Sequence, residues 1–78
     1  VVEARDLAAA VSTAIDTVLT ARQRRVAIAL IVDEVPIDVL AERMGTNRNA
    51  LYKALHDIRV KLRSEMREQG YIHDEHRR

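Results

Sequence analysis

The sequence predicts a single all-α domain of four helices that contains a helix-turn-helix. Apolar residues recur at helical spacing near both ends of the chain, and residues typical of helix caps stand between these segments. A chain of 78 residues without Phe or Trp holds one modest, aliphatic core.

The first predicted helix covers residues 3–18. Its apolar positions are four, four and three residues apart and form one face of a helix: Leu7, Val11, Ile15 and Val18. The second helix is expected to begin after Thr20, whose hydroxyl accepts a backbone hydrogen bond while Gln23, three residues on, completes a capping box.

The second helix continues through residues 26–32, which are apolar on every side. Four of these seven residues are β-branched, so a buried strand is an alternative. The cap at Thr20 and the lack of other strand candidates favour a buried helix that ends near Glu34.

Pro36 ends this pattern or opens the third helix, with Asp38 in the first turn facing the positive end of the helix. Gly45 supplies the left-handed conformation that ends the third helix, and Thr46 or Asn47 caps the fourth.

The fourth helix has the clearest period, and Gly70 is expected to stop it. Its apolar stripe consists of Leu51, Leu55, Ile58, Leu62 and Met66. The predicted core joins Leu40, Leu51, Leu55 and Leu62 to Ile28 and Ile31. The domain therefore covers residues 1–70, and residues 71–78 form a charged C-terminal tail.

Composition narrows the function. The absence of Cys favours the cytoplasm over secretion, no apolar run approaches the length of a membrane span, and no signal peptide is recognisable. The first residue, Val1, suggests a piece of a longer protein. Ser12 and Ser64 have no evident base beside them, and there is no Gly-rich phosphate loop, so we expect neither an enzyme nor a cofactor. His73 and His76 fit solvated side chains better than a metal site.

The net charge of +1 is unevenly distributed. Residues 48–63 hold five cations and one carboxylate, a local charge of +4. A near-zero total argues against nonspecific binding of nucleic acid, whereas a basic helix suits a directed contact with DNA.

Residues 40–54 have the pattern of a helix-turn-helix, in which two short helices are held so that the second enters the major groove. Ala41 is the small residue at the crossing and Gly45 makes the turn. The apolar clamp consists of Leu40, Met44, Leu51 and Ala54. An ordinary helical hairpin is the alternative.

The face of the fourth helix opposite its apolar stripe holds Asn49, Lys53, His56 and Val60, with Tyr52 and Arg63 on one flank. Lys can donate to guanine and Asn can pair with adenine, while Arg48, Arg59 and Arg63 suit phosphates. The alternative is a solvated charged face.

Four segments resemble region 4 of bacterial sigma factors, the extracytoplasmic-function type in particular. They read LTARQR at residues 19–24, VLAERMG at 39–45, ALYKALH at 50–56 and IRVKLR at 58–63. The resemblance covers about 45 residues. It implies a four-helix domain that recognises the −35 promoter element, docks on the flap of the RNA polymerase β subunit, and is often sequestered by an anti-sigma factor.

By position, the resemblance assigns base reading to Tyr52, Lys53 and His56, and contacts with the DNA backbone to Arg24, Arg48 and Arg59. The chain departs from the family at Tyr52, which is usually basic, and at Asp57, which is often basic. The alternatives are the helix-turn-helix of a response-regulator activator and a protein-interaction module that does not bind DNA.

Two charged features need partners. Arg22, Arg24 and Arg25 oppose the dipole of the second helix, so they suit either a phosphate or pairing with Asp16 and water. Asp57 would repel DNA. It can read a cytosine, pair with Lys53 or Lys61 four residues away, or simply point aside, and we expect the pairing.

Overall fold

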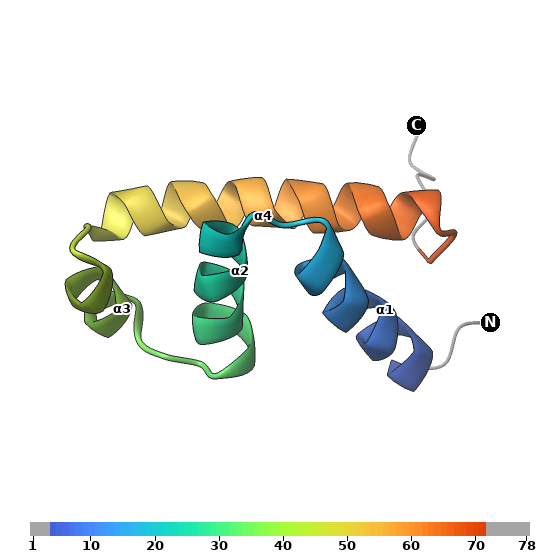
Figure 1. Cartoon of the computed structure of the whole chain (residues 1–78), viewed down its shortest axis with the longest axis horizontal. Helices are drawn as coiled ribbons and strands as arrows, with labels where there is room; N and C mark the ends of the chain where they lie inside the picture. The colour runs from blue at the N-terminus through green and yellow to red at the C-terminus, as the bar shows by residue number, and fades with distance from the viewer. Residues whose placement is uncertain (1–3, 72–78) are drawn as a thin grey trace, which may run out of the picture.

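The computed structural model describes residues 4–71 and shows four helices, with no strand in that range (Figure 1). The longest, α4 (Arg48–Glu68), runs along one side, and the other three lie side by side against it. These are α1 (Ala4–Thr17), α2 (Ala21–Ala27) with its π-helical continuation η1 (Ile28–Val32), and α3 (Ile37–Met44). The all-α, four-helix prediction is confirmed.

The predicted start of the second helix is confirmed at Thr20. The Thr20 hydroxyl accepts a hydrogen bond from the Gln23 backbone N–H at 3.1 Å, and the Gln23 side-chain oxygen accepts one from the Thr20 N–H at 3.0 Å. Two backbone donors at the helix start are thus satisfied reciprocally, which fixes where α2 begins after α1.

The second helix runs through residues 26–32 without a break, so the strand alternative is wrong. Its last turn widens to π-helical geometry and closes with hydrogen bonds from Asp33 N to Ile28 O at 2.9 Å and from Val35 N to Ala29 O at 2.8 Å. Glu34 then turns the chain with φ 56°, the only positive φ of a non-glycine residue in the described range.

The core forms where α1, α2 and α3 meet α4. Leu51, Ile58 and Val26 are the largest fully buried side chains. The remaining buried members of the cluster are Ile15, Leu19, Ala27, Leu40 and Ala41. The prediction is therefore right for Leu40 and Leu51, and Leu62 is half-buried against this cluster.

The core prediction is wrong for three residues. Ile28 is 36% exposed and Ile31 is 45% exposed, while Leu55 is only half-buried and lies outside the buried cluster. The second helix turns Val26 and Ala27 inward, and a chain this short cannot cover the rest of its surface. The apolar run at residues 26–32 is therefore buried on one face only, although every residue in it is apolar.

Two boundaries complete the fold. Gly70 adopts φ 85° two residues after the last residue of α4, as expected for a residue that stops a helix. The predicted tail lies outside the described residues except for Tyr71. None of the described helices is both long enough and apolar enough to cross a membrane.

Candidate nucleic-acid interface

The connection between α3 and α4 is built by backbone geometry. Gly45 adopts the left-handed conformation at φ 66°, and its N–H reaches Glu42 O at 3.2 Å while the Thr46 N–H reaches Ala41 O at 2.9 Å. This pair of bonds is a Schellman motif, which ends a helix and turns the chain sharply. The predicted role of Gly45 is confirmed.

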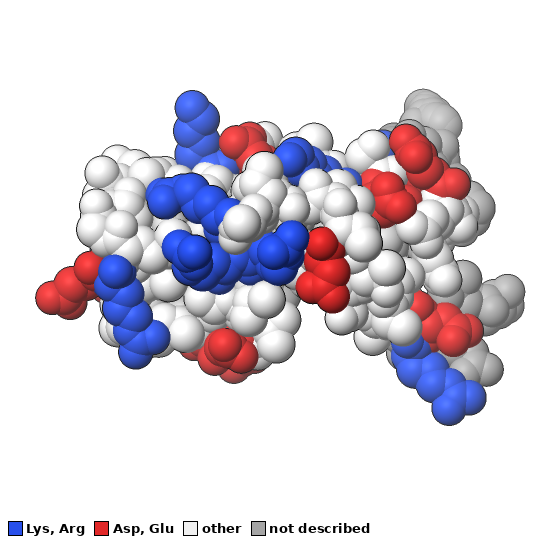
Figure 2. All heavy atoms as spheres, viewed as in Figure 1, with Lys and Arg blue, Asp and Glu red and all other residues white. Residues whose placement is uncertain are grey.

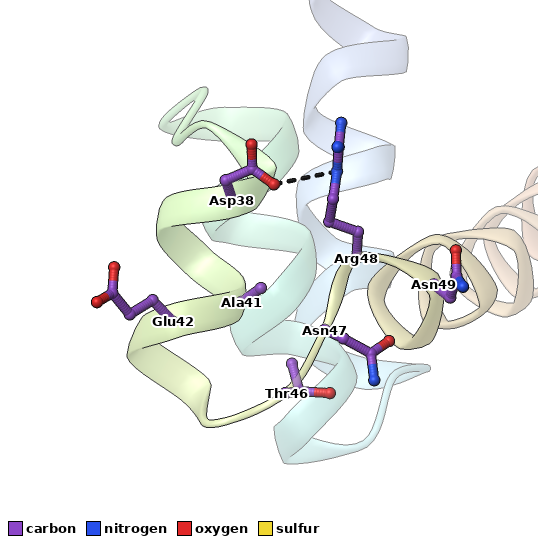
Figure 3. Close-up of a pocket in the computed structure, with 7 residues that line it drawn as sticks. All are labelled: Asp38, Ala41, Glu42, Thr46, Asn47, Arg48 and Asn49. Atoms are coloured by element: carbon purple, nitrogen blue, oxygen red, sulfur yellow. Dashed lines mark ion pairs between the residues drawn. The ribbon is translucent and has the colours of Figure 1, made fainter.

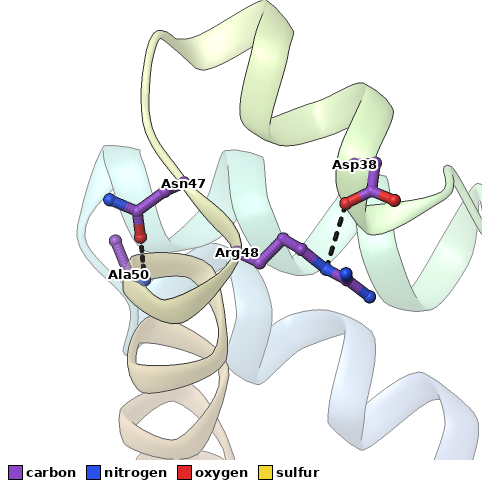
Figure 4. Close-up of polar contacts among 4 residues, drawn as sticks. All are labelled: Asp38, Asn47, Arg48 and Ala50. Carbon is purple, nitrogen blue, oxygen red and sulfur yellow. Dashed lines mark hydrogen bonds and ion pairs between the residues drawn. The ribbon is translucent and has the colours of Figure 1, made fainter.

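Asn47 then caps α4. Its side-chain oxygen accepts a hydrogen bond from the Ala50 backbone N–H at 2.8 Å (Figure 4). Of the two caps considered from the sequence, Thr46 and Asn47, the structure uses the second. This hydrogen bond fixes the start of α4, which is separated from the end of α3 by three residues.

The apolar contacts expected between α3 and α4 are present. Ala41, Leu40 and Leu51 are buried, and Met44 and Ala54 are half-buried. With α3 held in this way, the outer face of α4 is left on the surface. This packing is compatible with a helix-turn-helix, although it also suits an ordinary helical hairpin.

The predicted contact residues on α4 all lie on the surface of one helix. These exposed residues are Arg48, Asn49, Tyr52, Lys53, His56 and Arg59. They follow the turn at residues 45–47 without interruption, so one element presents amide, aromatic, imidazole and cationic groups together. The structure thus brings six of the seven predicted site residues onto a single exposed helix.

A shallow hollow of about 450 Å³ continues this surface toward the end of α4, lined by His56, Arg59, Val60, Arg63, Ser64 and Arg67. Arg67 was not among the residues predicted from the sequence. Its signal was the four-residue spacing of Arg59, Arg63 and Arg67, which places three guanidinium groups along one side of a helix.

The seventh predicted residue, Arg24, is placed differently. It is half-buried, and its guanidinium donates to the Ile15 carbonyl at 3.4 Å and to the Asp16 carbonyl at 3.1 Å. These carbonyls lie at the negative end of α1, so the cation stabilises that helix end. The expected pairing with Asp16 takes another form, because the acceptors are the backbone carbonyls of Ile15 and Asp16 and not the Asp16 carboxylate.

The expected ion pair of Asp57 is wrong within the described residues. Among residues 4–71, no ion pair joins Asp57 to Lys53 or to Lys61. The Lys61 ammonium instead donates to the side-chain oxygen of Gln23 at 2.9 Å, which ties α4 to the start of α2. The spacing of four residues along α4 favoured an ion pair between Lys61 and Asp57. In the structure, the hydrogen-bond acceptor of Lys61 is instead Gln23 of α2.

Arg48 has an acidic partner that the sequence analysis did not predict. Its Nε atom lies 3.0 Å from Asp38 Oδ1 (Figure 4). Both residues line an open hollow of about 480 Å³ between α3 and the start of α4, together with Ala41, Glu42, Thr46, Asn47 and Asn49 (Figure 3). The residues are ten positions apart, so only the turn between the helices brings them together.

Figure 2 shows a second gathering of basic side chains, where the start of α2 meets α4, with acidic side chains mostly toward the edges of this view. This agrees with the cluster of Arg22, Arg24 and Arg25 in the sequence. Cations therefore lie near the middle of the molecule as well as along the outer face of α4.

Two further findings bear on function. Among residues 4–71, no group of three or more His, Cys, Asp or Glu side chains is arranged to hold a metal ion, and His73 and His76 lie outside this range. Comparisons with protein-family models, curated proteins and solved structures found no match for this chain.

Proposed function

We propose that this chain is the promoter-binding domain of a bacterial sigma factor of the extracytoplasmic-function type, which directs RNA polymerase to promoters through the −35 element. The observation that carries the proposal is the exposed face of α4, which begins directly after the turn at residues 45–47 and holds Lys53, His56 and Arg59. A helix held in this way by a short partner helix can enter the major groove.

Base reading is assigned to the middle of this face. Lys53 donates to guanine acceptors and Asn49 pairs with adenine, while the Tyr52 ring contacts thymine methyl groups and His56 lies one turn further on. Arg48 and Arg59 contact phosphates on either side. Arg24 adds a phosphate contact only through the N–H groups that Ile15 and Asp16 do not engage.

The protein partners in this proposal are the β-subunit flap of RNA polymerase and an anti-sigma factor, and the site of action is the cytoplasm. A small domain with few phosphate contacts binds DNA weakly alone, so attachment to the polymerase raises its effective concentration at the promoter. An anti-sigma factor acts by covering the surface that polymerase or promoter requires.

One observation favours a second candidate, a module that binds only protein. Ile28, Ile31 and Val32 are exposed to 36%, 45% and 61% on one short segment. Large apolar side chains grouped on a surface are typical of protein interfaces. This candidate makes no use of the basic face of α4.

The test is a mobility-shift titration with duplexes that carry the −35 element and with scrambled duplexes, with and without polymerase. We expect Lys53→Ala to cost about 1–3 kcal/mol and to relax preference at one position. Arg59→Ala should weaken all duplexes alike and reduce the salt slope by about 1.

Arg43→Ala is the matched control, because it removes an exposed cation from α3 and leaves α4 intact. Identical specificity profiles for the Lys53 and Arg59 variants would contradict the assigned roles. Absence of duplex binding under both conditions, with capture of a protein partner lost on Ile31→Ser, would support the second candidate.

A further inference from the structure

The ion pair between Asp38 and Arg48 joins the two helices at the base of the proposed DNA surface. Asp38 lies in the first turn of α3 and Arg48 is the first residue of α4. The Asp38 side chain is 69% exposed and the Arg48 side chain 59%, so the pair faces solvent. An exposed pair of this kind adds at most about 1 kcal/mol to folding stability.

The atoms used by the pair suggest another role. Asp38 engages Arg48 through Nε, and within the described residues the Arg48 guanidinium makes no other hydrogen bond or ion pair. The terminal amino groups of the fork are therefore left for another acceptor. A guanidinium fork matches the oxygens of a phosphate, which it can bind through two parallel hydrogen bonds.

We propose that Asp38 is a positioning residue for DNA binding, which holds the Arg48 guanidinium through Nε so that its terminal amino groups meet a backbone phosphate. The inference rests on the proposed function and adds to it a residue from α3. It also explains a carboxylate close to a surface that binds an anion, where charge alone would disfavour one.

Two roles of Asp38, repulsion of phosphate and positioning of Arg48, predict different DNA affinities for variants that lack its carboxylate. If the carboxylate only repels phosphate or competes for Arg48, every variant without the charge binds DNA more tightly. If it positions Arg48, the hydrogen-bond acceptor matters as well as the charge. Asp38→Asn removes the charge and keeps the oxygen, whereas Asp38→Ala removes both, so the ratio of the two affinities isolates positioning.

The experiment measures the affinity of both variants for one promoter duplex by fluorescence anisotropy, with thermal unfolding recorded for each. We expect Asp38→Ala to bind about two- to tenfold more weakly than Asp38→Asn, the range that one hydrogen bond gives. The same two substitutions are then made in an Arg48→Ala background, where the ratio should fall to one because no guanidinium is left to position.

Equal affinities of the Asn and Ala variants in the presence of Arg48 would overturn the inference and leave the proposed function intact. A ratio that persists without Arg48 would overturn it too, since the effect would then come from the stability of α3. If the wild-type protein binds no duplex, with or without polymerase, the proposed function itself fails and the inference falls with it.

Discussion

At the scale of single residues, Gly45 controls the path from α3 to α4 through its backbone alone. It adopts φ 66°, and a Cβ atom built there would meet nothing within 4 Å. Space is therefore available for a side chain, and the conformation is the only obstacle. The left-handed region costs residues with a Cβ about 1–2 kcal/mol.

We expect Gly45→Ala to lower the free energy of unfolding by about 1 kcal/mol. Gly45→Asn should lose less, because Asn tolerates the left-handed region better than Ala. Urea denaturation followed by circular dichroism measures both. An Ala variant as stable as the wild type would show that the turn can relax to another conformation.

Asp57 is the second residue whose effect can be isolated. Because it makes no ion pair with Lys53 or Lys61, its charge remains beside the proposed DNA surface. The structure thus removes the reason for expecting Asp57 to position a basic side chain. Of the roles considered, the simplest left is a general reduction in affinity for DNA.

Asp57→Asn should therefore raise affinity for promoter and random duplexes by the same factor, because it removes repulsion from every phosphate alike. Titration of both duplexes in parallel gives the ratio, which should equal that of the wild type. A change limited to one G·C pair would instead indicate that Asp57 accepts a hydrogen bond from cytosine.

At the scale of elements, the helix ends were predictable because their signals are local. Thr20 and Gln23, which form the capping box, are three residues apart. Gly45 ends α3 and Asn47 caps α4 through groups at most four residues away, so a short stretch of sequence contains every partner. The same holds for the proposed DNA face, since a single helix carries its residues at known angular spacing.

The features that were missed depend on how helices meet. Arg24 donates to two carbonyls of α1, 9 and 8 residues away, and Lys61 donates to Gln23 of α2, 38 residues away. No local pattern specifies these distances. Exposure of Ile28 and Ile31 was missed for a related reason: a run that is apolar on every side has no period to show which face is buried.

The second helix offers a direct test of this division between inner and outer faces. Val26 is fully buried and Val32 is 61% exposed, so one residue type samples both environments in one continuous helix. Val26→Ala should cost about 2 kcal/mol or more, from lost burial and a residual cavity, and Val32→Ala about 0.5 kcal/mol or less. Chemical denaturation of both variants provides the comparison, and similar losses would mean that a partner or a second copy covers Val32.

At the scale of the whole molecule, net charge limits the affinity for DNA that the proposed function allows to the isolated domain. The chain has a net charge of +1. The Arg24 guanidinium already donates hydrogen bonds to two carbonyls at the end of α1. Arg48 and Arg59 are then the main phosphate contacts of the proposal. Each phosphate neutralised contributes a slope of about −0.9 in a plot of log affinity against log salt.

The isolated domain should therefore show a shallow salt slope of about −2 and bind a promoter duplex weakly, at micromolar concentrations or above. Affinity titrations at several salt concentrations measure the slope directly. A steeper slope that Arg63→Ala reduces would mean that the hollow lined by Arg59, Arg63 and Arg67 also holds the DNA backbone. Nanomolar binding at physiological salt would contradict the view that attachment to polymerase provides most of the working affinity, because the domain would then need no partner to occupy its site.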